Sequence, residues 1–452
     1  MKKTHNRWLI LIVSIVSQVI VGSAYAWGVI NPPLRDLYGF SATQVGFAFS
    51  LALGLMPPWM ILAGKISPKI GVNTTILIGG LLQAAGFILL SQFISEDPTT
   101  IFIFYGVFSS LGIGIVYGTA VPNVVKWFPD KRGLAGGLIV GGFGGGAVLF
   151  APIFTAVMNA LGSYEVRNIW VPIDGVMTLG SHINGEFVAG ADPASVFIPG
   201  IESMFLYFGI IFAIAAVLAF FLIKSPPEGY KPEGWNPPAV APGAVGSTVN
   251  LSPGEMIKTL NFWLLFGMFT FCMVGGIMIL GQIGSIGVTR IGLASGGALL
   301  ATAVLAQGLG NTFGRVVWGG ISDKIGRSWA CVCMNILTIL GLILFLMTGA
   351  DDFAIFVIAA VLVVSCFGGF AGTYPAITAD NFGPANMAVN YGIIFFGFGI
   401  SAFVGPNLAG AVIDATGTHD LAFMLSIVFS VIAMVLTFIL MARMNNAKKV
   451  VS

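Results

Sequence analysis

Long apolar stretches recur from one end of this chain to the other, and they constrain its fold more than any other feature. Each stretch is long enough to cross, as one α-helix, a bilayer whose hydrocarbon core is about 30 Å thick. Of the 452 residues, 57% are hydrophobic and only 8% are charged, whereas a soluble domain carries about 25% charged residues. This composition excludes a soluble enzyme, a nucleic-acid-binding protein and a disordered scaffold. It indicates a helical protein that crosses a lipid bilayer several times.

Dividing the apolar stretches at charged residues and prolines gives twelve predicted membrane-spanning helices. They lie at residues 8–30, 43–63, 73–94, 99–123, 133–161, 203–223, 260–284, 294–319, 328–349, 353–377, 387–412 and 420–442. The expected fold is therefore an all-α membrane protein with twelve transmembrane helices. The first stretch follows basic residues, as in a signal peptide, but it is longer than the apolar part of one. We therefore expect the chain to keep it as its first helix.

The distribution of Lys and Arg predicts the orientation of these helices. All but four of the 20 basic residues fall on one side of the membrane, together with both termini. Arg35, Arg167 and Arg290 fall on the opposite side, and Arg315 falls inside a span. Because loops rich in Lys and Arg stay in the cytoplasm, both termini are predicted to be cytoplasmic.

Two polar segments divide the chain. Residues 225–258 contain seven prolines and two lysines and follow directly on Lys224, which is typical of a linker. They are predicted to join an N-terminal six-helix half, 1–224, to a C-terminal six-helix half, 259–452, on the cytoplasmic side. Residues 163–202 form an outer insert between the fifth and sixth spans, and their sequence indicates no particular ligand.

The two halves contain matching loops. Gly64-Lys-Ile-Ser-Pro-Lys-Ile-Gly71 follows the second span, and Gly319-Gly-Ile-Ser-Asp-Lys-Ile-Gly326 follows the eighth. Two six-helix halves repeated in parallel, with a substrate site between them, are the architecture of the major facilitator superfamily. The second loop also resembles that superfamily's signature loop, whereas the first has Pro68 in the acidic position. The candidate gating and structural residues are Gly64, Gly71, Gly319, Asp323, Lys324, Gly326 and Arg327, and a gating salt bridge is expected in the second loop.

Arg315 is the only acidic or basic residue placed well inside a span, about 13 Å of helix from Lys324 at the membrane edge. A charge at that depth costs at least a few kcal/mol, and no acidic residue in the spans offers a partner. The guanidinium matches a carboxylate with two hydrogen bonds, so we interpret Arg315 as the binding residue for an organic anion. The alternative is that it reaches the cytoplasmic face or bonds helix carbonyls. Asn311, one turn earlier, either assists it or packs between helices.

Aromatic residues inside the spans are the second candidate signal, although most aromatics in such a chain pack in the core or face lipid. Tyr117 stands out because its hydroxyl needs a partner and glycines surround it. The candidates for lining a cavity are Tyr25, Tyr117, Phe367, Phe395 and Phe398.

No cofactor or metal site is predicted. The four cysteines lie in apolar stretches without the spacing of a zinc site, and the three histidines lie near a terminus or in loops. The glycine-rich segment 136–146 lacks the Lys-Ser/Thr that a phosphate-binding loop requires, so helix packing explains it better.

Several motifs closely resemble those of the oxalate/formate antiporter family, a monocarboxylate-porter-like branch of the same superfamily. They are Ile115-Val-Tyr-Gly118, Trp127-Phe-Pro-Asp-Lys-Arg-Gly133, Asn390-Tyr-Gly392 and the arginine of the eighth span. The resemblance implies secondary transport of small carboxylates by a multi-pass protein of the cell (inner or plasma) membrane. It also implies that Arg315 and Asn311 bind substrate, and that Tyr25, Tyr117, Phe367 and Phe395 line the cavity.

One departure from that family bears on the substrate. Oxalate carriers place a lysine six residues after the glycine of the Asn-Tyr-Gly motif, where this chain has Phe398. Two cations suit a dianion, whereas one suits a monoanion, because a second buried negative charge would stay uncompensated. A position that is aromatic in those carriers is Ala371 here, which leaves room for a larger substrate.

The leading hypothesis is therefore a monomeric transporter of small monocarboxylates such as lactate, pyruvate or formate, with a proton as the expected co-transported ion. It would work by alternating access of the two halves. The alternatives are an oxalate/formate-type antiporter that exchanges a dicarboxylate for a monocarboxylate, and a non-transporting membrane sensor. An enzyme is not expected, because the spans contain no nucleophile, base or metal cluster.

Overall fold

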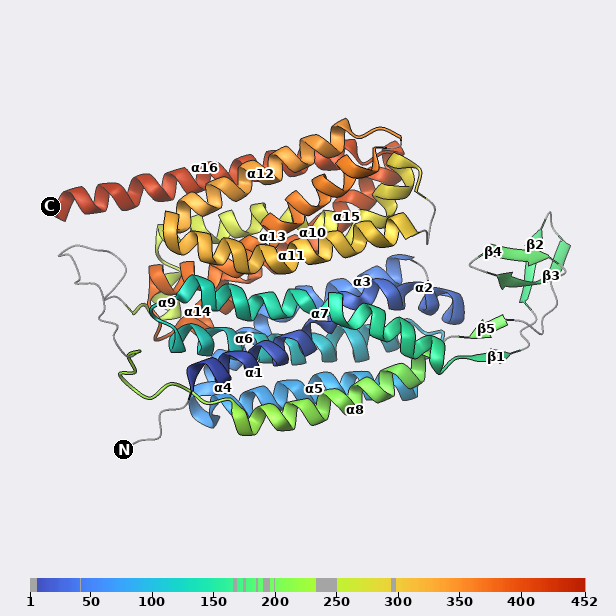
Figure 1. Ribbon diagram of the computed structural model, residues 1–452, viewed down its shortest axis with the longest axis horizontal. Coiled ribbons are helices and arrows are strands. Elements are labelled where there is room, and N and C mark those ends of the chain that lie inside the picture. Colours follow the sequence, from blue (N-terminus) through green and yellow to red (C-terminus); the bar gives the residue numbers. More distant parts are fainter. Residues whose placement is uncertain are drawn as a thin grey trace.

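Long, roughly parallel helices form most of the molecule (Figure 1). The computed structural model describes residues 6–451, apart from 41, 166–168, 174–175, 184–185, 190–195, 199, 233–249, 294–297 and 351. In Figure 1 the helices of the first half, coloured blue to green, lie below those of the second half, coloured yellow to red. Both chain termini lie at one end of the bundle, called the linker end below, and the strands lie at the other, the strand end.

The first half contains broken as well as continuous helices. They are α1 (Arg7–Val21), η1 (Gly22–Ala26), α2 (Trp27–Tyr38), α3 (Ala42–Gly54), α4 (Met56–Ile70), α5 (Val72–Phe93), η2 (Ile101–Val107), α6 (Phe108–Trp127), α7 (Arg132–Ala160) and α8 (Ile201–Leu222). The first predicted span is not one α-helix, because the 3₁₀ segment η1 interrupts it between α1 and α2. The predicted fourth span begins as the π-helix η2.

The second half follows the linker. Its helices are α9 (Pro253–Met256), α10 (Leu260–Ile291), α11 (Ala298–Ile325), α12 (Arg327–Met347), α13 (Phe353–Phe382), α14 (Met387–Ile394), α15 (Phe396–Thr416) and α16 (Asp420–Val451). The eleventh predicted span is divided at Phe395, between α14 and α15.

Among the described residues, eleven helical segments are long and apolar enough to cross a membrane. They match eleven of the twelve predicted spans. The remaining prediction, 294–319, corresponds to α11, a helix of 28 residues that is less apolar because it carries Gln307, Asn311 and Arg315. Large apolar side chains such as Phe221 and Phe313 are exposed on the outside of the bundle, as expected of a surface that faces lipid.

The insert at 163–202 contains short antiparallel strands. β1 (Ser163–Glu165) pairs with β5 (Val196–Ile198), and β3 (Val176–Ile183) lies between β2 (Ile169–Ile173) and β4 (Glu186–Ala189). Figure 1 shows them beyond the helices at the strand end.

Side chains anchor both ends of the linker. The Lys224 carbonyl accepts hydrogen bonds from Asn123 Nδ2 at 3.1 Å and Trp127 Nε1 at 2.9 Å. At the other end, the Leu251 carbonyl accepts hydrogen bonds from the side-chain amides of Asn386 and Asn390, both at 3.1 Å. The linker therefore holds α6 of the first half and α14 of the second at the same end of the bundle. Its middle, 233–249, lies outside the described residues.

The two matching loops have the same backbone geometry. Gly71 ends α4 with φ 91° and ψ 149°, and Gly326 ends α11 with φ 90° and ψ 149°. Residues with a side chain rarely adopt this backbone conformation, so glycine is the residue suited to both turns. The sequence match at an offset of 255 residues thus corresponds to a shared turn between consecutive helices.

Candidate functional site

Arg315 of α11 lies in the middle of the bundle, facing α7, and only 2% of it is exposed. Its Nε donates a hydrogen bond to Asn311 Oδ1 at 3.0 Å, one turn earlier on the same helix. Its Nη1 donates a hydrogen bond to the Val140 carbonyl of α7 at 3.0 Å. Asn311 is equally buried, at 2% exposed. The arginine therefore bridges the two halves of the molecule through a backbone oxygen.

Among the described residues, no carboxylate forms an ion pair with Arg315. The ion pairs found there use Arg7, Arg132, Arg290 and Arg327 instead. A guanidinium has five N–H donors, and the Asn311 and Val140 oxygens accept from two of them. The donors that remain are enough for a bidentate interaction with a carboxylate. The arrangement thus holds a positive charge in place without neutralising it.

Glycines allow α7 and α11 to approach closely around this charge. A Cβ atom added at Gly319 would lie 2.6 Å from the Gly133 carbonyl oxygen, which is closer than real Cβ contacts. A Cβ at Gly137 would collide with the Arg315 carbonyl. The glycine-rich segment 136–146 is therefore a helix-packing surface, as the sequence suggested, and it brings α7 against the turn that carries Arg315.

Aromatic rings extend from the guanidinium into the bundle. Arg315 Cζ lies 5.9 Å from the Tyr25 ring centre and 5.8 Å from that of Phe143, within range of a cation–π attraction. Successive ring centres are 5.0 Å apart for Tyr25–Phe143, 5.3 Å for Phe143–Tyr117, 5.3 Å for Tyr117–Phe395, 4.8 Å for Phe395–Phe398 and 6.4 Å for Phe398–Phe367. All five aromatic residues selected from the sequence belong to this connected set.

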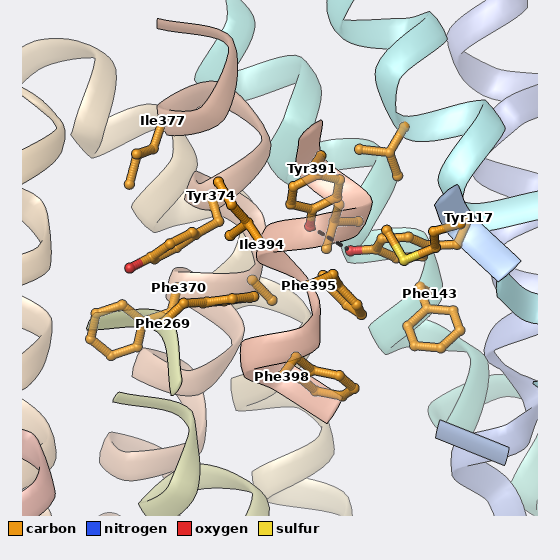
Figure 2. Packing of buried hydrophobic residues seen from close by; sticks show 14 of the residues in the cluster. Tyr117, Phe143, Phe269, Phe370, Tyr374, Ile377, Tyr391, Ile394, Phe395 and Phe398 are labelled. Carbon is orange, nitrogen blue, oxygen red and sulfur yellow. Dashed lines mark hydrogen bonds between the residues drawn. The ribbon is translucent and has the colours of Figure 1, made fainter. Parts of the chain in front are cut away.

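The set also contains residues that the sequence analysis did not select. The Tyr117 and Tyr391 hydroxyls lie 3.4 Å apart and form a hydrogen bond between α6 and α14, one from each half. Figure 2 shows this bond, with the tilted rings of Phe395 and Phe398 below Tyr391. Tyr391 was visible in the Asn-Tyr-Gly motif, but Phe143 was hidden in a glycine-rich segment and the Val140 carbonyl gives no sequence signal.

The broken first span explains the position of Tyr25. A Cβ at Gly22 would overlap the backbone of Phe143, so η1 presses directly against α7. The 3₁₀ turn from Gly22 to Ala26 carries Tyr25 on this contact, facing Phe143. A change of helix type thus places a tyrosine beside the buried arginine.

A cluster of charged side chains at the linker end joins the two halves. Asp323 of α11 accepts hydrogen bonds from the backbone N–H groups of Gly133 at 3.1 Å and Leu134 at 2.9 Å, in the first turn of α7. Arg327 forms ion pairs with Asp323 at 2.6 Å and with Asp380 of α13 at 3.1 Å. Arg132 pairs with Asp380 at 2.9 Å. Asp323, Arg327, Asp380 and Arg132 are called the linker-end charge cluster below.

The other candidate loop residues have different surroundings. Lys324 is exposed, and it forms none of the ion pairs among the described residues. Gly64 packs against α14, since a Cβ there would lie 2.8 Å from the Val389 backbone nitrogen. The salt bridges therefore lie in the second loop, where the sequence placed them, whereas the first loop contributes close packing.

A smaller charged group lies at the strand end, within the second half. Arg290 forms an ion pair with Asp420 and donates hydrogen bonds to Thr348 Oγ1 at 3.1 Å and the Leu346 carbonyl at 2.6 Å. Burial, with the nearby Arg290 charge, lowers the pKa of His419 from its ordinary value. These contacts tie the ends of α10, α12 and α16 together, far from the Arg315 site.

Comparison with known proteins agrees with this arrangement. The model of the Major Facilitator Superfamily matches residues 8–307 and 292–451, which is nearly the whole chain. The chain belongs to the major facilitator superfamily. It is therefore a secondary transporter and a multi-pass membrane protein, and not an enzyme.

Individual members of the superfamily align with most of this chain. The oxalate:formate antiporter of Oxalobacter formigenes is 26% identical over 98% of this chain and 94% of that protein. Monocarboxylate transporter 14 of Mus musculus is 24% identical over 92% of this chain and 86% of that protein. The solved fucose:proton symporter FucP of E. coli has a TM-score of 0.63 and 16% identity over 96% of this chain and 99% of that one, which shows the shared fold. The predicted resemblance to the oxalate/formate antiporter and monocarboxylate-porter branch is confirmed at this level.

Among the described residues of this superfamily member, no group of three or more His, Cys, Asp or Glu side chains could hold a metal ion. The residues around Arg315 are amide, hydroxyl and aromatic groups, which suit an organic anion: donors for its oxygens and flat apolar faces for its carbon atoms. The site thus combines one fixed positive charge with an apolar wall.

Proposed function

We propose that this protein transports small monocarboxylates of the lactate or pyruvate type by alternating access, with Arg315 binding the carboxylate. The observation that carries the proposal is a buried guanidinium bonded to neutral oxygens, with no carboxylate in ion-pair contact among the described residues. An uncompensated charge in a membrane is costly and marks a functional site. A substrate carboxylate would neutralise it and gain charge-assisted hydrogen bonds.

The aromatic set supports a compact substrate with a short apolar part. Tyr117 would bond the carboxylate or a neighbouring oxygen, since its hydroxyl already lies within the buried set with Tyr391. Phe395, Phe398 and Phe367 would contact the carbon atoms of the substrate, and they are between 1% and 3% exposed. A hydroxyl or keto group on a two- or three-carbon acid matches this mixture of polar and apolar groups.

We place both termini and the linker end in the cytoplasm, because most Lys and Arg residues belong to that face. The protein would act as a monomer in the cell membrane, and its two six-helix halves, 1–224 and 259–452, would rock about the Arg315 site. The linker-end charge cluster would then close the cytoplasmic side. No carboxylate or histidine is placed deep in the predicted spans, so a co-transported proton would be carried by the substrate.

The test of the proposal is uptake of labelled L-lactate into proteoliposomes that contain the purified protein, with and without an inward proton gradient. We expect uptake that the gradient accelerates and that pyruvate, but not oxalate, inhibits. Exchange of oxalate for formate without lactate uptake would contradict the proposal. Protein-free liposomes supply the control for passive entry of the undissociated acid.

The second candidate, exchange of a dicarboxylate, is favoured by the 26% identity to a protein named as an oxalate:formate antiporter. Charge counting argues against it. A dianion beside Arg315 would leave one negative charge uncompensated near Phe398, which is 2% exposed.

Replacing Phe398 with lysine tests this argument. The second cation is expected to slow lactate uptake about tenfold or more and to introduce saturable oxalate uptake, because an unpaired buried charge costs several kcal/mol. Phe398→Met is the matched control, since it has a similar length without the charge, and it should keep lactate selectivity. Oxalate uptake by the wild type or by Phe398→Met would show that one cation is sufficient for a dianion.

A further inference from the structure

We propose that Val140 and Gly144 of α7 form a seat for the Arg315 guanidinium, and that this guanidinium seat replaces the substrate carboxylate when the transporter returns without substrate. Gly144 is then a positioning residue that acts through Arg315. The inference rests on the proposed function, because it assumes that Arg315 binds the transported carboxylate.

The contacts that define the guanidinium seat come from one turn of α7. Val140 supplies a carbonyl oxygen 3.0 Å from Arg315 Nη1. This oxygen can accept the guanidinium as well as its helical partner, because a carbonyl has two lone pairs. Gly144 follows four residues later on the same face of the helix. A Cβ added there would lie 2.8 Å from Arg315 Nε and 3.2 Å from both Cδ and Cζ. The guanidinium therefore occupies the space that a side chain at position 144 would fill.

The guanidinium seat addresses a physical problem that every carrier with a single binding cation faces. When the two halves close, the cation is removed from water, and an unpartnered buried charge costs several kcal/mol. A bound carboxylate removes that cost on the loaded half of the cycle. On the return step, the protein's own oxygens must lower that cost, although neutral oxygens do not cancel the charge. Asn311 Oδ1 and the Val140 carbonyl are such oxygens, and with them Arg315 is buried to 2% exposure.

The partner oxygens belong to different halves, and this makes the guanidinium seat conformation-dependent. Asn311 lies four residues from Arg315 on α11 and moves with it, whereas Val140 lies on α7 of the first half. The Val140 contact therefore forms only when α7 and α11 lie close together. After the substrate has left, Arg315 Nη1 can donate its hydrogen bond to the Val140 carbonyl in the closed bundle. The carrier is therefore able to close without substrate. The geometry thus favours net transport over obligatory exchange.

The chain offers a matched pair of glycines for testing the guanidinium seat. Gly144 faces the guanidinium, whereas a Cβ at the adjacent Gly145 would lie 3.5 Å from Thr312 Cγ2, an ordinary van der Waals contact. Gly144→Ala should therefore displace the guanidinium from the Val140 carbonyl, and Gly145→Ala should not. Both variants add one methyl group to the same helix, so their effects on helix propensity are similar.

The experiment compares two modes of lactate flux in proteoliposomes: net uptake into substrate-free vesicles, and exchange with vesicles loaded with unlabelled lactate. For Gly144→Ala we expect net uptake to fall about tenfold or more, as for the loss of a hydrogen bond to a charged group, while exchange falls much less. Gly145→Ala should resemble the wild type in both modes. A purely structural role of Gly144 would lower both modes equally and would overturn the proposal, as would normal net uptake.

A measurement on the wild type decides the question if Gly144→Ala is not recovered folded. Vesicles loaded with labelled lactate are diluted into medium with or without external lactate. The guanidinium seat predicts comparable efflux in the two media, within about a factor of ten. Rapid efflux only with external lactate would mean that the carrier cannot return without substrate, and the proposal would be wrong. Absence of flux in both modes would instead contradict the proposed function itself.

Discussion

Replacing Arg315 with alanine is expected to lower lactate uptake by about 100-fold or more, because two hydrogen bonds to a charged group, each contributing about 1.5–3 kcal/mol, are removed. The aromatic wall would remain, but it binds apolar atoms and cannot compensate a carboxylate that leaves water. The measurement is the initial rate of labelled lactate uptake per molecule of reconstituted protein. The loss should extend to exchange as well as to net uptake, since both need the carboxylate site.

The same replacement is expected to leave folding intact or to improve it. Arg315 is a buried charge bonded only to neutral oxygens in the described residues, and such a charge costs stability. The melting temperature of purified Arg315→Ala in detergent should therefore be no lower than that of the wild type. Arg443→Ala is the control arginine, because it is exposed on α16 and its Nε lies 3.4 Å from Asn261 Oδ1. Wild-type uptake by Arg315→Ala would show that the carboxylate binds elsewhere.

The helices could be predicted because apolar length is a strong and local signal in a membrane protein. The breaks within them could not. The 3₁₀ turn η1 begins where Gly22 approaches the Phe143 backbone, a contact between residues more than a hundred positions apart. The eighth span was predicted, although its helix, α11, is not among the eleven described segments that are apolar enough to qualify as spans, because the charged edge at Asp323 and Lys324 marked its end.

The candidate site could be selected from the sequence where its chemistry was unusual for its surroundings. Arg315 and Asn311 stand out in an apolar span, and the structure brings both of them to the same buried point. Phe143 is one aromatic among many, so it could be identified only from its contact with Tyr117. The Val140 carbonyl could not be predicted at all, because every residue has a carbonyl and only tertiary packing selects one.

Within the linker-end charge cluster, Asp323 makes two kinds of contact that differ in strength. Asp323 accepts hydrogen bonds from two N–H groups in the first turn of α7, where a helix carries a partial positive charge. Its pairing with Arg327 adds an ion pair between partly exposed groups, which contributes only about 0–1 kcal/mol. Because Arg327 belongs to the second half itself, the helix-capping contact is the part of these interactions that connects α11 to α7.

Replacing Asp323 with alanine is expected to open the linker end and to slow lactate uptake about tenfold. The lost cap contributes about 0.5–2 kcal/mol, and under the proposed alternating access the linker end closes once in every transport cycle. Lys324→Ala is the matched control, because Lys324 is the next residue and forms none of the ion pairs among the described residues. It should transport at the wild-type rate.

Chemical labelling would detect the opening directly. Ala379 of α13 is fully buried and packs with Val125 of α6 and Met387 of α14 near the charge cluster. A cysteine introduced at 379 should react slowly with a water-soluble maleimide in the otherwise wild-type protein, and about tenfold faster with Asp323→Ala, in proportion to the population of the open state. The native cysteines supply the background, and three of the four are buried. Equal labelling in both proteins, with unchanged uptake, would mean that Asp323 stabilises α7 without controlling access.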